Sequence, residues 1–189
     1  MAKHGDQTVG TSVGARSPGP SYQDLLDKEV NPVPDSLRDN TNPYLGSENL
    51  SVDRYLSRDF HEKEVEHVWQ RTWQAVCRET EVGKPGDTHV YDITRFSIIV
   101  TRAGSGQLKA FLNACLHRGR QLVDKSGNYE KFRCPYHAFT WGLDGDFKWA
   151  PCKWDFGHIK DEEFGLTEVQ VDTWGGWVFI NMDPGAQSL

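Results

Sequence analysis

The stretch Asn113–Phe139, NACLHRGRQLVDKSGNYEKFRCPYHAF, carries a Cys-x-His motif and a Cys-x-x-His motif. The first motif places Cys115 and His117 in one segment, and the second places Cys134 and His137 in another, with sixteen residues between them. Thiolates and neutral imidazoles are ligands for iron–sulfur clusters, zinc and copper. The stretch therefore predicts two loops that each bring one cysteine and one histidine to a shared metal site.

Three interpretations of the mixed pairs compete: loop residues that bind no metal, a structural Cys2His2 zinc site, and a Rieske [2Fe–2S] cluster. Zinc modules usually pair Cys with Cys and His with His along the chain. A Rieske cluster uses two thiolates on one iron and two imidazoles on the other, so each loop can supply one ligand to each iron. Neutral imidazoles also make this cluster easier to reduce than an all-cysteine cluster. The mixed pairs favour the Rieske cluster over both alternatives.

The composition argues against nucleic-acid-binding, membrane-spanning and secreted proteins. The chain has 189 residues, 37% of them hydrophobic, and a formal net charge of -6, which does not favour a nucleic-acid or anionic-membrane partner. No apolar run approaches the roughly 20 residues of a membrane helix, and the N-terminus has no apolar signal-peptide segment. We therefore expect a cytoplasmic protein whose four cysteines are metal ligands or free thiols.

The chain divides into three predicted parts. Residues 1–20 are rich in Gly, Ser, Thr and Pro and are expected to form a disordered tail. Residues 21–50 are expected to form an extended arm with a short helix capped by Ser21. Residues 51–189 carry the globular domain.

Within this domain the pattern changes from helix to strand. Asp59 and Glu62 have capping-box spacing, and the apolar residues from Val65 to Val76 mark a helical face. The segments THVYDI, FSIIVTR, LKAFLNA, LTEVQVDTW and GGWVFINM predict strands, and Asp144-Gly145 predicts a tight turn. The sequence therefore predicts one small antiparallel β domain with an N-terminal helix.

The segments YLSRDFHEKEVEHVWQRTWQAV, FLNACLHRG, CPYHAFTWGLDG and TWGGWVFINMDP resemble the α subunits of Rieske non-haem iron oxygenases, the aromatic-ring-hydroxylating family. The resemblance implies a mainly β Rieske [2Fe–2S] domain with one cluster per chain. It implies that Cys115 and Cys134 bind one iron and that His117 and His137 bind the other. One departure is Ala138, where these oxygenases often have glycine.

The resemblance also implies an oxidoreductase that takes part in aromatic hydrocarbon catabolism. The domain would relay electrons from a reductase or ferredoxin to a mononuclear Fe(II) that activates O2, in a catalytic domain or in a neighbouring α subunit. After His137 the sequence offers only His158, so it cannot supply two histidines to that second iron. We therefore expect the mononuclear iron only in a catalytic domain missing from this sequence. The chain, a fragment or a split gene product, would then only transfer electrons, and the full-length protein would form a homo-oligomer.

A freestanding Rieske ferredoxin is the alternative function. Such carriers are shorter and lack a helical arm, so residues 21–75 argue against it. We expect Leu116, Tyr136 and Phe139 to shield the cluster. Three further histidine and cysteine residues are not expected to be ligands. We expect His158 to be a surface histidine, Cys77 to be a small buried residue and Cys152 to lie outside the ligand set.

Overall fold

The structure is a computed structural model, which describes residues 19–38 and 49–189. These residues fall into two compact units that divide between Ser51 and Val52. The predicted tail, 1–20, lies almost wholly outside the described residues, and so does the end of the predicted arm, 39–48.

The first unit contains two short helices, α1 (Tyr22–Leu26) and α2 (Asp35–Arg38). Ser21 caps α1 as expected, because its Oγ accepts from the Asp24 N–H at 3.1 Å while the Asp24 carboxylate accepts from the Ser21 N–H at 2.7 Å. The second helix was not expected, so the prediction of an extended arm is wrong at these residues. Its acidic first residue and basic last residue complement the helix dipole.

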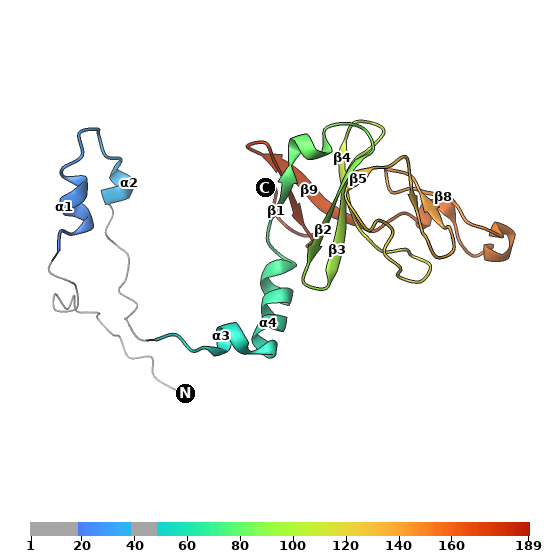
Figure 1. Cartoon of the computed structure of the whole chain (residues 1–189), viewed down its shortest axis with the longest axis horizontal. Helices are drawn as coiled ribbons and strands as arrows, with labels where there is room; N and C mark the ends of the chain where they lie inside the picture. The colour runs from blue at the N-terminus through green and yellow to red at the C-terminus, as the bar shows by residue number, and fades with distance from the viewer. Residues whose placement is uncertain (1–18, 39–48) are drawn as a thin grey trace. The chain divides into compact units, whose positions relative to one another are not determined.

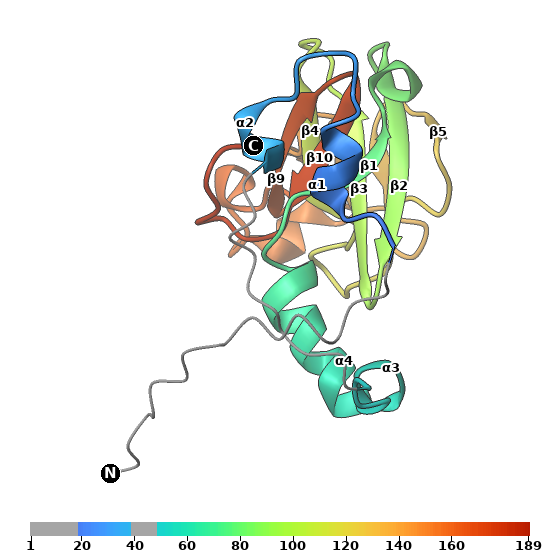
Figure 2. The ribbon, with the colours of Figure 1, turned by 90° about the vertical axis from the view of Figure 1, so that its left-hand side faces the viewer.

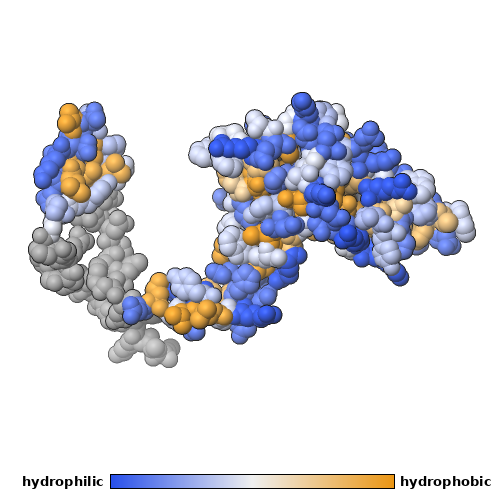
Figure 3. Space-filling model, viewed as in Figure 1, coloured by the Kyte–Doolittle hydropathy of each residue, from blue (hydrophilic) through white to orange (hydrophobic). Residues whose placement is uncertain are grey.

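The second unit begins with α3 (Asp53–Leu56) and α4 (Arg58–Glu64), which continues as a π-helical turn. Ser57 caps α4 by accepting from the Phe60 N–H at 3.3 Å, so the predicted capping box, which would begin at Asp59, is wrong. Apolar atoms gather over α3, where Leu56 is 79% exposed (Figure 3). No described helix is long and apolar enough to span a membrane.

The rest of this unit is antiparallel β structure. A seven-stranded sheet has the order β1-β10-β9-β4-β3-β2-β5, and a three-stranded sheet has the order β6-β7-β8. Figure 1 shows α3 and α4 on one side of the strands of this unit and β8 on the other, and Figure 2 shows β10 between β1 and β9. The strands are β1 (Gln74–Arg78), β2 (Asp87–Ile93), β3 (Phe96–Arg102), β4 (Leu108–Leu112), β5 (Gly127–Asn128), β6 (Phe132–Arg133), β7 (Thr140–Trp141), β8 (Phe147–Trp149), β9 (Glu168–Trp174) and β10 (Trp177–Asn181). The mainly antiparallel β fold expected from the sequence is confirmed.

One helical expectation is corrected by β1. The apolar series from Val65 was expected to continue to Val76, but the π-helical turn ends at Trp69 and Val76 lies in β1. Val65 is fully buried, whereas Val76 packs at the edge of a core formed by the large sheet. A short apolar series fits both periods, so the spacing did not separate the helix from the strand that follows it.

The interior strand β3 separates two hydrophobic cores. Ile98 and Val100 face a core that also contains Cys77, whereas Ile99 faces a core that contains Cys115 and Cys134. Successive strand residues point to opposite faces, and both faces of β3 are covered, which explains its continuous apolar run. The second core lies between the large sheet and the small one, and the candidate cysteines belong to it.

Candidate metal centre

The first candidate loop follows β4 and is closed by its own backbone. The Cys115 N–H donates to the Arg120 carbonyl at 2.8 Å, and the Gly119 N–H donates to the Cys115 carbonyl at 2.7 Å. Gly119 has a φ of 70°, a left-handed conformation that suits glycine. His117 therefore stands at the tip of a tight turn.

The second candidate loop joins β6 to β7 and is closed by the same pattern of backbone hydrogen bonds as the first loop. The Cys134 N–H donates to the Phe139 carbonyl at 2.8 Å, and the Ala138 N–H donates to the Cys134 carbonyl at 2.9 Å. Ala138 has a φ of 61°, so an alanine occupies the left-handed position that glycine takes in the first loop. A methyl group there is accommodated at the expense of strain.

The two loops bring the candidate thiols together in the protein interior. Cys115 and Cys134 are only 2% and 3% exposed and belong to the same core cluster. Burial is the main cause that raises the pKa of Cys115; the neighbouring Cys134 thiol adds to the rise, and the backbone N–H groups of His117 and Arg118 oppose it. Such donors stabilise a thiolate and tune the potential of a bound cluster.

The candidate imidazoles lie beside each other at the outer side of the site. Their ring centroids are 4.9 Å apart and the planes are inclined by 65°. His117 stacks on Phe139 at 4.5 Å and His137 stacks on Tyr136 at 3.8 Å. Burial, followed by the positive charges of His137 and Arg118, lowers the pKa of His117, which favours the neutral imidazole that a metal needs.

These four side chains are a candidate donor set, with two buried sulfurs and two neighbouring imidazoles. Among the described residues, no group of three or more His, Cys, Asp or Glu side chains is placed to hold a single metal ion. A cluster with two irons needs only two protein donors on each iron. The arrangement therefore fits a Rieske cluster.

Asn113 anchors the first loop, and sequence reasoning missed it. Its Oδ1 accepts from the N–H groups of Leu122 and Val123, both at 3.0 Å, and its Nδ2 donates to the Val123 carbonyl at 2.7 Å. Asn113 is only 4% exposed. An amide directly after an apolar strand and two residues before a candidate ligand is the signal that identifies such a residue, because a buried amide needs partners.

The second loop is anchored by aromatic rings. Phe132, Trp141 and Phe147 stand in one row across the small sheet, and all three are buried. Phe139 lies 6.4 Å from Trp141 and 6.1 Å from Phe147, measured between ring centroids. Of the three residues expected to shield the cluster, Phe139 is 1% exposed, Leu116 is 38% exposed and Tyr136 is 59% exposed, although its ring stacks on His137.

The other candidate residues lie outside the donor set. Cys77 is buried in the other core, where burial raises the pKa of its thiol to about 11. Cys152 is exposed. His158 is exposed and lines, with His117 and Leu116, a hollow of about 330 Å³ at the outer side of the site.

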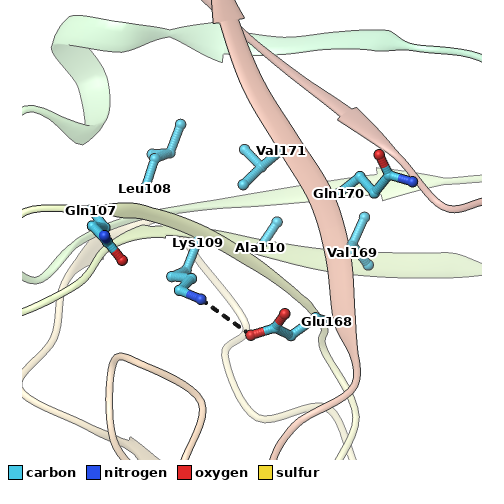
Figure 4. A pocket seen from close by; sticks show the side chains of 8 residues that line it. All are labelled: Gln107, Leu108, Lys109, Ala110, Glu168, Val169, Gln170 and Val171. Carbon is cyan, nitrogen blue, oxygen red and sulfur yellow. Dashed lines mark hydrogen bonds and ion pairs between the residues drawn. The ribbon is translucent and has the colours of Figure 1, made fainter. Parts of the chain in front are cut away.

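A separate groove of about 440 Å³ lies where β4 and β9 diverge. The two strands pair only at Ala110–Val169 and Phe111–Glu168. The Lys109 ammonium reaches the Glu168 carboxylate at 3.2 Å beside this groove (Figure 4). No candidate ligand lines it, so it plays no part in the donor set.

A family model described as the Rieske [2Fe-2S] domain matches residues 72–160, which include all four candidate ligands. Carnitine monooxygenase oxygenase subunit from Escherichia coli (strain K12) is 33% identical over 136 residues, which are 71% of this chain and 36% of that protein. Biphenyl 2,3-dioxygenase subunit alpha from Rhodococcus jostii (strain RHA1) is 29% identical over 137 residues, 71% of this chain and 30% of that protein. The chain thus spans about a third of the length of these relatives.

The chain is also similar to solved structures of oxygenases. The structure of a quaternary ammonium Rieske monooxygenase, described as revealing insights into inter-subunit electron transfer, superposes with a TM-score of 0.69 and 31% identity over 72% of this chain and 38% of that one. Naphthalene 1,2-dioxygenase from Rhodococcus sp. superposes with a TM-score of 0.66 and 32% identity over 69% of this chain and 31% of that one. These relatives favour an oxygenase subunit over a freestanding ferredoxin, and the domain match selects a [2Fe–2S] cluster over zinc.

Proposed function

Because this chain carries a Rieske [2Fe–2S] domain of the kind found in the α subunits of Rieske oxygenases, we propose that it relays single electrons within such an oxygenase. In this proposal Cys115 and Cys134 hold one iron, and His117 and His137 hold the other. The observation that carries the assignment is the juxtaposition of two buried thiols with two adjacent imidazoles.

The protein's own residues prepare this site in three ways. The backbone hydrogen bonds of the two loops fix the position of each cysteine. Phe139 covers the inner side of His117 and excludes water from it. The N–H groups of His117 and Arg118 favour the thiolate form of Cys115. When bound, the cluster supplies one-electron chemistry at a higher potential than an all-cysteine cluster would have.

The donor and acceptor in this proposal follow from the family. The donor is a reductase or ferredoxin, and the acceptor is a mononuclear iron in a catalytic domain or in a neighbouring subunit of a homo-oligomer. The inter-subunit electron transfer described for the quaternary ammonium monooxygenase supports the second arrangement. We also propose a cytoplasmic location, because reducing conditions keep cysteines such as Cys115 and Cys134 free to bind a cluster.

An aromatic or similar apolar substrate is our proposal for the complete oxygenase. The relation to biphenyl 2,3-dioxygenase supports it, whereas the relation to carnitine monooxygenase favours a quaternary ammonium compound. Parallel assays with one substrate of each class separate the two. The chain by itself should hydroxylate neither, because it offers only His158 after His137 for a second iron. Product formed by the purified 189-residue chain would show that an iron site has been overlooked.

The electron-transfer proposal is tested by metal analysis and electron paramagnetic resonance. The purified chain should contain about two irons and two inorganic sulfides, and dithionite should produce the signal of a reduced Rieske cluster. A colourless protein with one equivalent of zinc would overturn the proposal.

A further inference from the structure

We propose that the outer face of the β6-β7-β8 sheet is the docking surface for an acidic electron-donor protein. The donor's chemistry is that of a small iron–sulfur or flavin protein with a carboxylate-rich face. This inference rests on the proposed electron-transfer function and specifies where the electron enters.

The strand register separates this face from the core. Arg133 pairs with Thr140, which pairs with Trp149, so these three residues form one row across the sheet. The neighbouring row of phenylalanine and tryptophan side chains is buried against the candidate centre. Because successive strand residues point to opposite faces, Arg133 and Thr140 point away from the row of Phe132 and Trp141, and a register shift between β7 and β8 brings Trp149 to the same side although it is two residues from the buried Phe147. Trp149 is 47% exposed there.

The face is basic although the chain is acidic. Lys131, Arg133 and Lys148 line a shallow hollow of about 300 Å³ together with Thr140 and Trp149. Lys148 forms an ion pair with Asp146, whereas Lys131 and Arg133 have no ion-pair partner among residues 19–38 and 49–189. The whole chain carries a formal net charge of -6. The net charge disfavours the approach of an acidic protein in general, whereas Lys131 and Arg133 attract its carboxylates to this face.

The exposed indole suits the same occupant. Tryptophan and arginine are enriched at the centres of protein interfaces, where an aromatic ring supplies contact area and charged groups give orientation. Lys131 and Arg133 flank the side of the hollow formed by β6, and Trp149 forms the side contributed by β8. A carboxylate-rich rim around an apolar centre complements this arrangement.

The face is directly connected to the candidate centre. Arg133 is followed by Cys134, so a donor docked on β6 is one residue from a proposed thiolate ligand. The hollow beside His117 shares no residue with this face. A donor on the small sheet therefore leaves the histidine side open for the acceptor. In the transfer itself no bond breaks: the reduced donor loses one electron and the oxidised cluster gains it.

The first experiment measures the rate at which a chemically reduced, acidic [2Fe–2S] ferredoxin reduces the cluster-loaded full chain in a stopped-flow instrument. Lys131→Glu/Arg133→Glu should slow reduction by about tenfold or more at low ionic strength, since steering changes association rates by 10–10³. Rising salt should narrow this difference, because it screens exposed charges. Lys131→Gln/Arg133→Gln should give an intermediate rate and guards against misfolding of the reversed variant.

A matched control carries the same charge change at the far end of the unit. Arg58 and Lys63 lie exposed on α4 and form no ion pair among the described residues. Arg58→Glu/Lys63→Glu should reduce the rate by less than twofold. Equal slowing in both double variants would mean that only net charge matters, and would overturn the docking face. Dithionite should reduce all variants equally, whereas absence of any reducible cluster would instead refute the proposed function.

A second experiment reads the surface without turnover. Carbodiimide couples lysine ammonium groups to carboxylates that contact them, and mass spectrometry identifies the linked residues. Links from the ferredoxin should form at Lys131 and Lys148 and disappear at high salt. Links concentrated at lysines outside this face would place the donor elsewhere and overturn the proposal.

Discussion

The two loops around the candidate centre have one backbone but different sequences. Both close with a hydrogen bond from the cysteine N–H to the carbonyl five residues on, and both turn through a left-handed residue four positions after the cysteine. Yet the histidine is the third residue of one loop and the fourth of the other. The conformation of each loop is therefore set by its internal hydrogen bonds and not by the spacing of the cysteine and histidine.

The loops also differ in what holds them to the protein. The first rests on the buried Asn113 amide, which satisfies backbone groups nine and ten positions further along the chain. The second rests on the row of aromatic rings in the small sheet. A polar anchor fixes hydrogen-bond partners by direction, whereas an aromatic anchor fixes the loop by packing. The two anchors should therefore respond differently to substitution.

The largest expected effect concerns the ligands, at which the two loops should be equivalent. Cys115→Ser and Cys134→Ser should each abolish the cluster's paramagnetic signal, because each removes one thiolate from the same iron. Cys77→Ala and Cys152→Ser should retain the signal, since Cys77 lies in the other core and Cys152 is exposed. Iron and sulfide content, measured beside the spectrum, checks the result. A signal that survives in either ligand variant would contradict the assignment.

The next largest effect is expected when the aromatic anchor of the second loop is removed. Phe132→Ala deletes a fully buried ring beneath the second loop and should lower the free energy of unfolding by about 3–5 kcal/mol. Phe132→Leu keeps most of the volume and should cost clearly less. Urea denaturation of both variants measures the difference. Equal, small losses would mean that the loop is not held by this packing.

Removing the Asn113 side chain should lower the free energy of unfolding by less than removing Phe132, and its effect should be confined to the first loop. Asn113→Ala leaves the N–H groups of Leu122 and Val123 without their acceptor in a buried place, at a cost of about 2–3 kcal/mol. Asn113→Asp keeps an acceptor oxygen but loses the Nδ2 donor to the Val123 carbonyl and the Ser97 hydroxyl. Because it buries a carboxylate beside that carbonyl, it should destabilise the protein at neutral pH and less at low pH, where the protonated carboxyl can donate. Urea denaturation and amide exchange at the two N–H groups measure both variants, and an Asn113→Ala variant as stable as the original would disprove the anchor's role.

Much of this architecture could be predicted from sequence, because the signals were local. Runs of β-branched and aromatic residues located five of the seven strands of the large sheet but not β1 and β5, and Asp144-Gly145 located the turn between β7 and β8, where Gly145 has a φ of 85°. The mixed Cys and His pairs pointed to the ligand set. Ser21 identified the cap of α1.

The remaining features depend on tertiary context. The shared loop backbone was hidden, because Cys-x-His and Cys-x-x-His look different until the hydrogen bonds are known. The position of Asn113 between a strand and a candidate ligand is a local signal, but its partners, the N–H groups of Leu122 and Val123, lie nine and ten residues further along the chain. The helix boundary near Trp69 was missed because the short apolar series from Val65 to Val76 fits both the helical and the strand period.

The smallest expected effect concerns the left-handed corner, the position at which the two loops match in conformation but differ in residue. Gly119 and Ala138 have φ values of 70° and 61°. An alanine in this region costs about 1–2 kcal/mol in strain, while replacing glycine by alanine recovers about 0.4–1 kcal/mol by restricting the unfolded chain. Gly119→Ala should therefore destabilise the protein by up to about 1.6 kcal/mol. A Cβ at Gly119 meets no atom within 4 Å, so contacts with other residues add nothing to these two terms.

Ala138→Gly should have the opposite sign and stabilise the protein by a similar amount, because it relieves the same strain in the second loop. The combined exchange, Gly119→Ala/Ala138→Gly, should leave the free energy of unfolding within about 0.5 kcal/mol of the original, since independent effects add. Thermal and urea unfolding of the three variants measure these differences. If Ala138→Gly destabilises instead, the Ala138 methyl group contributes packing that outweighs its strain. The two corners would then match in backbone conformation but differ in what their side chains do.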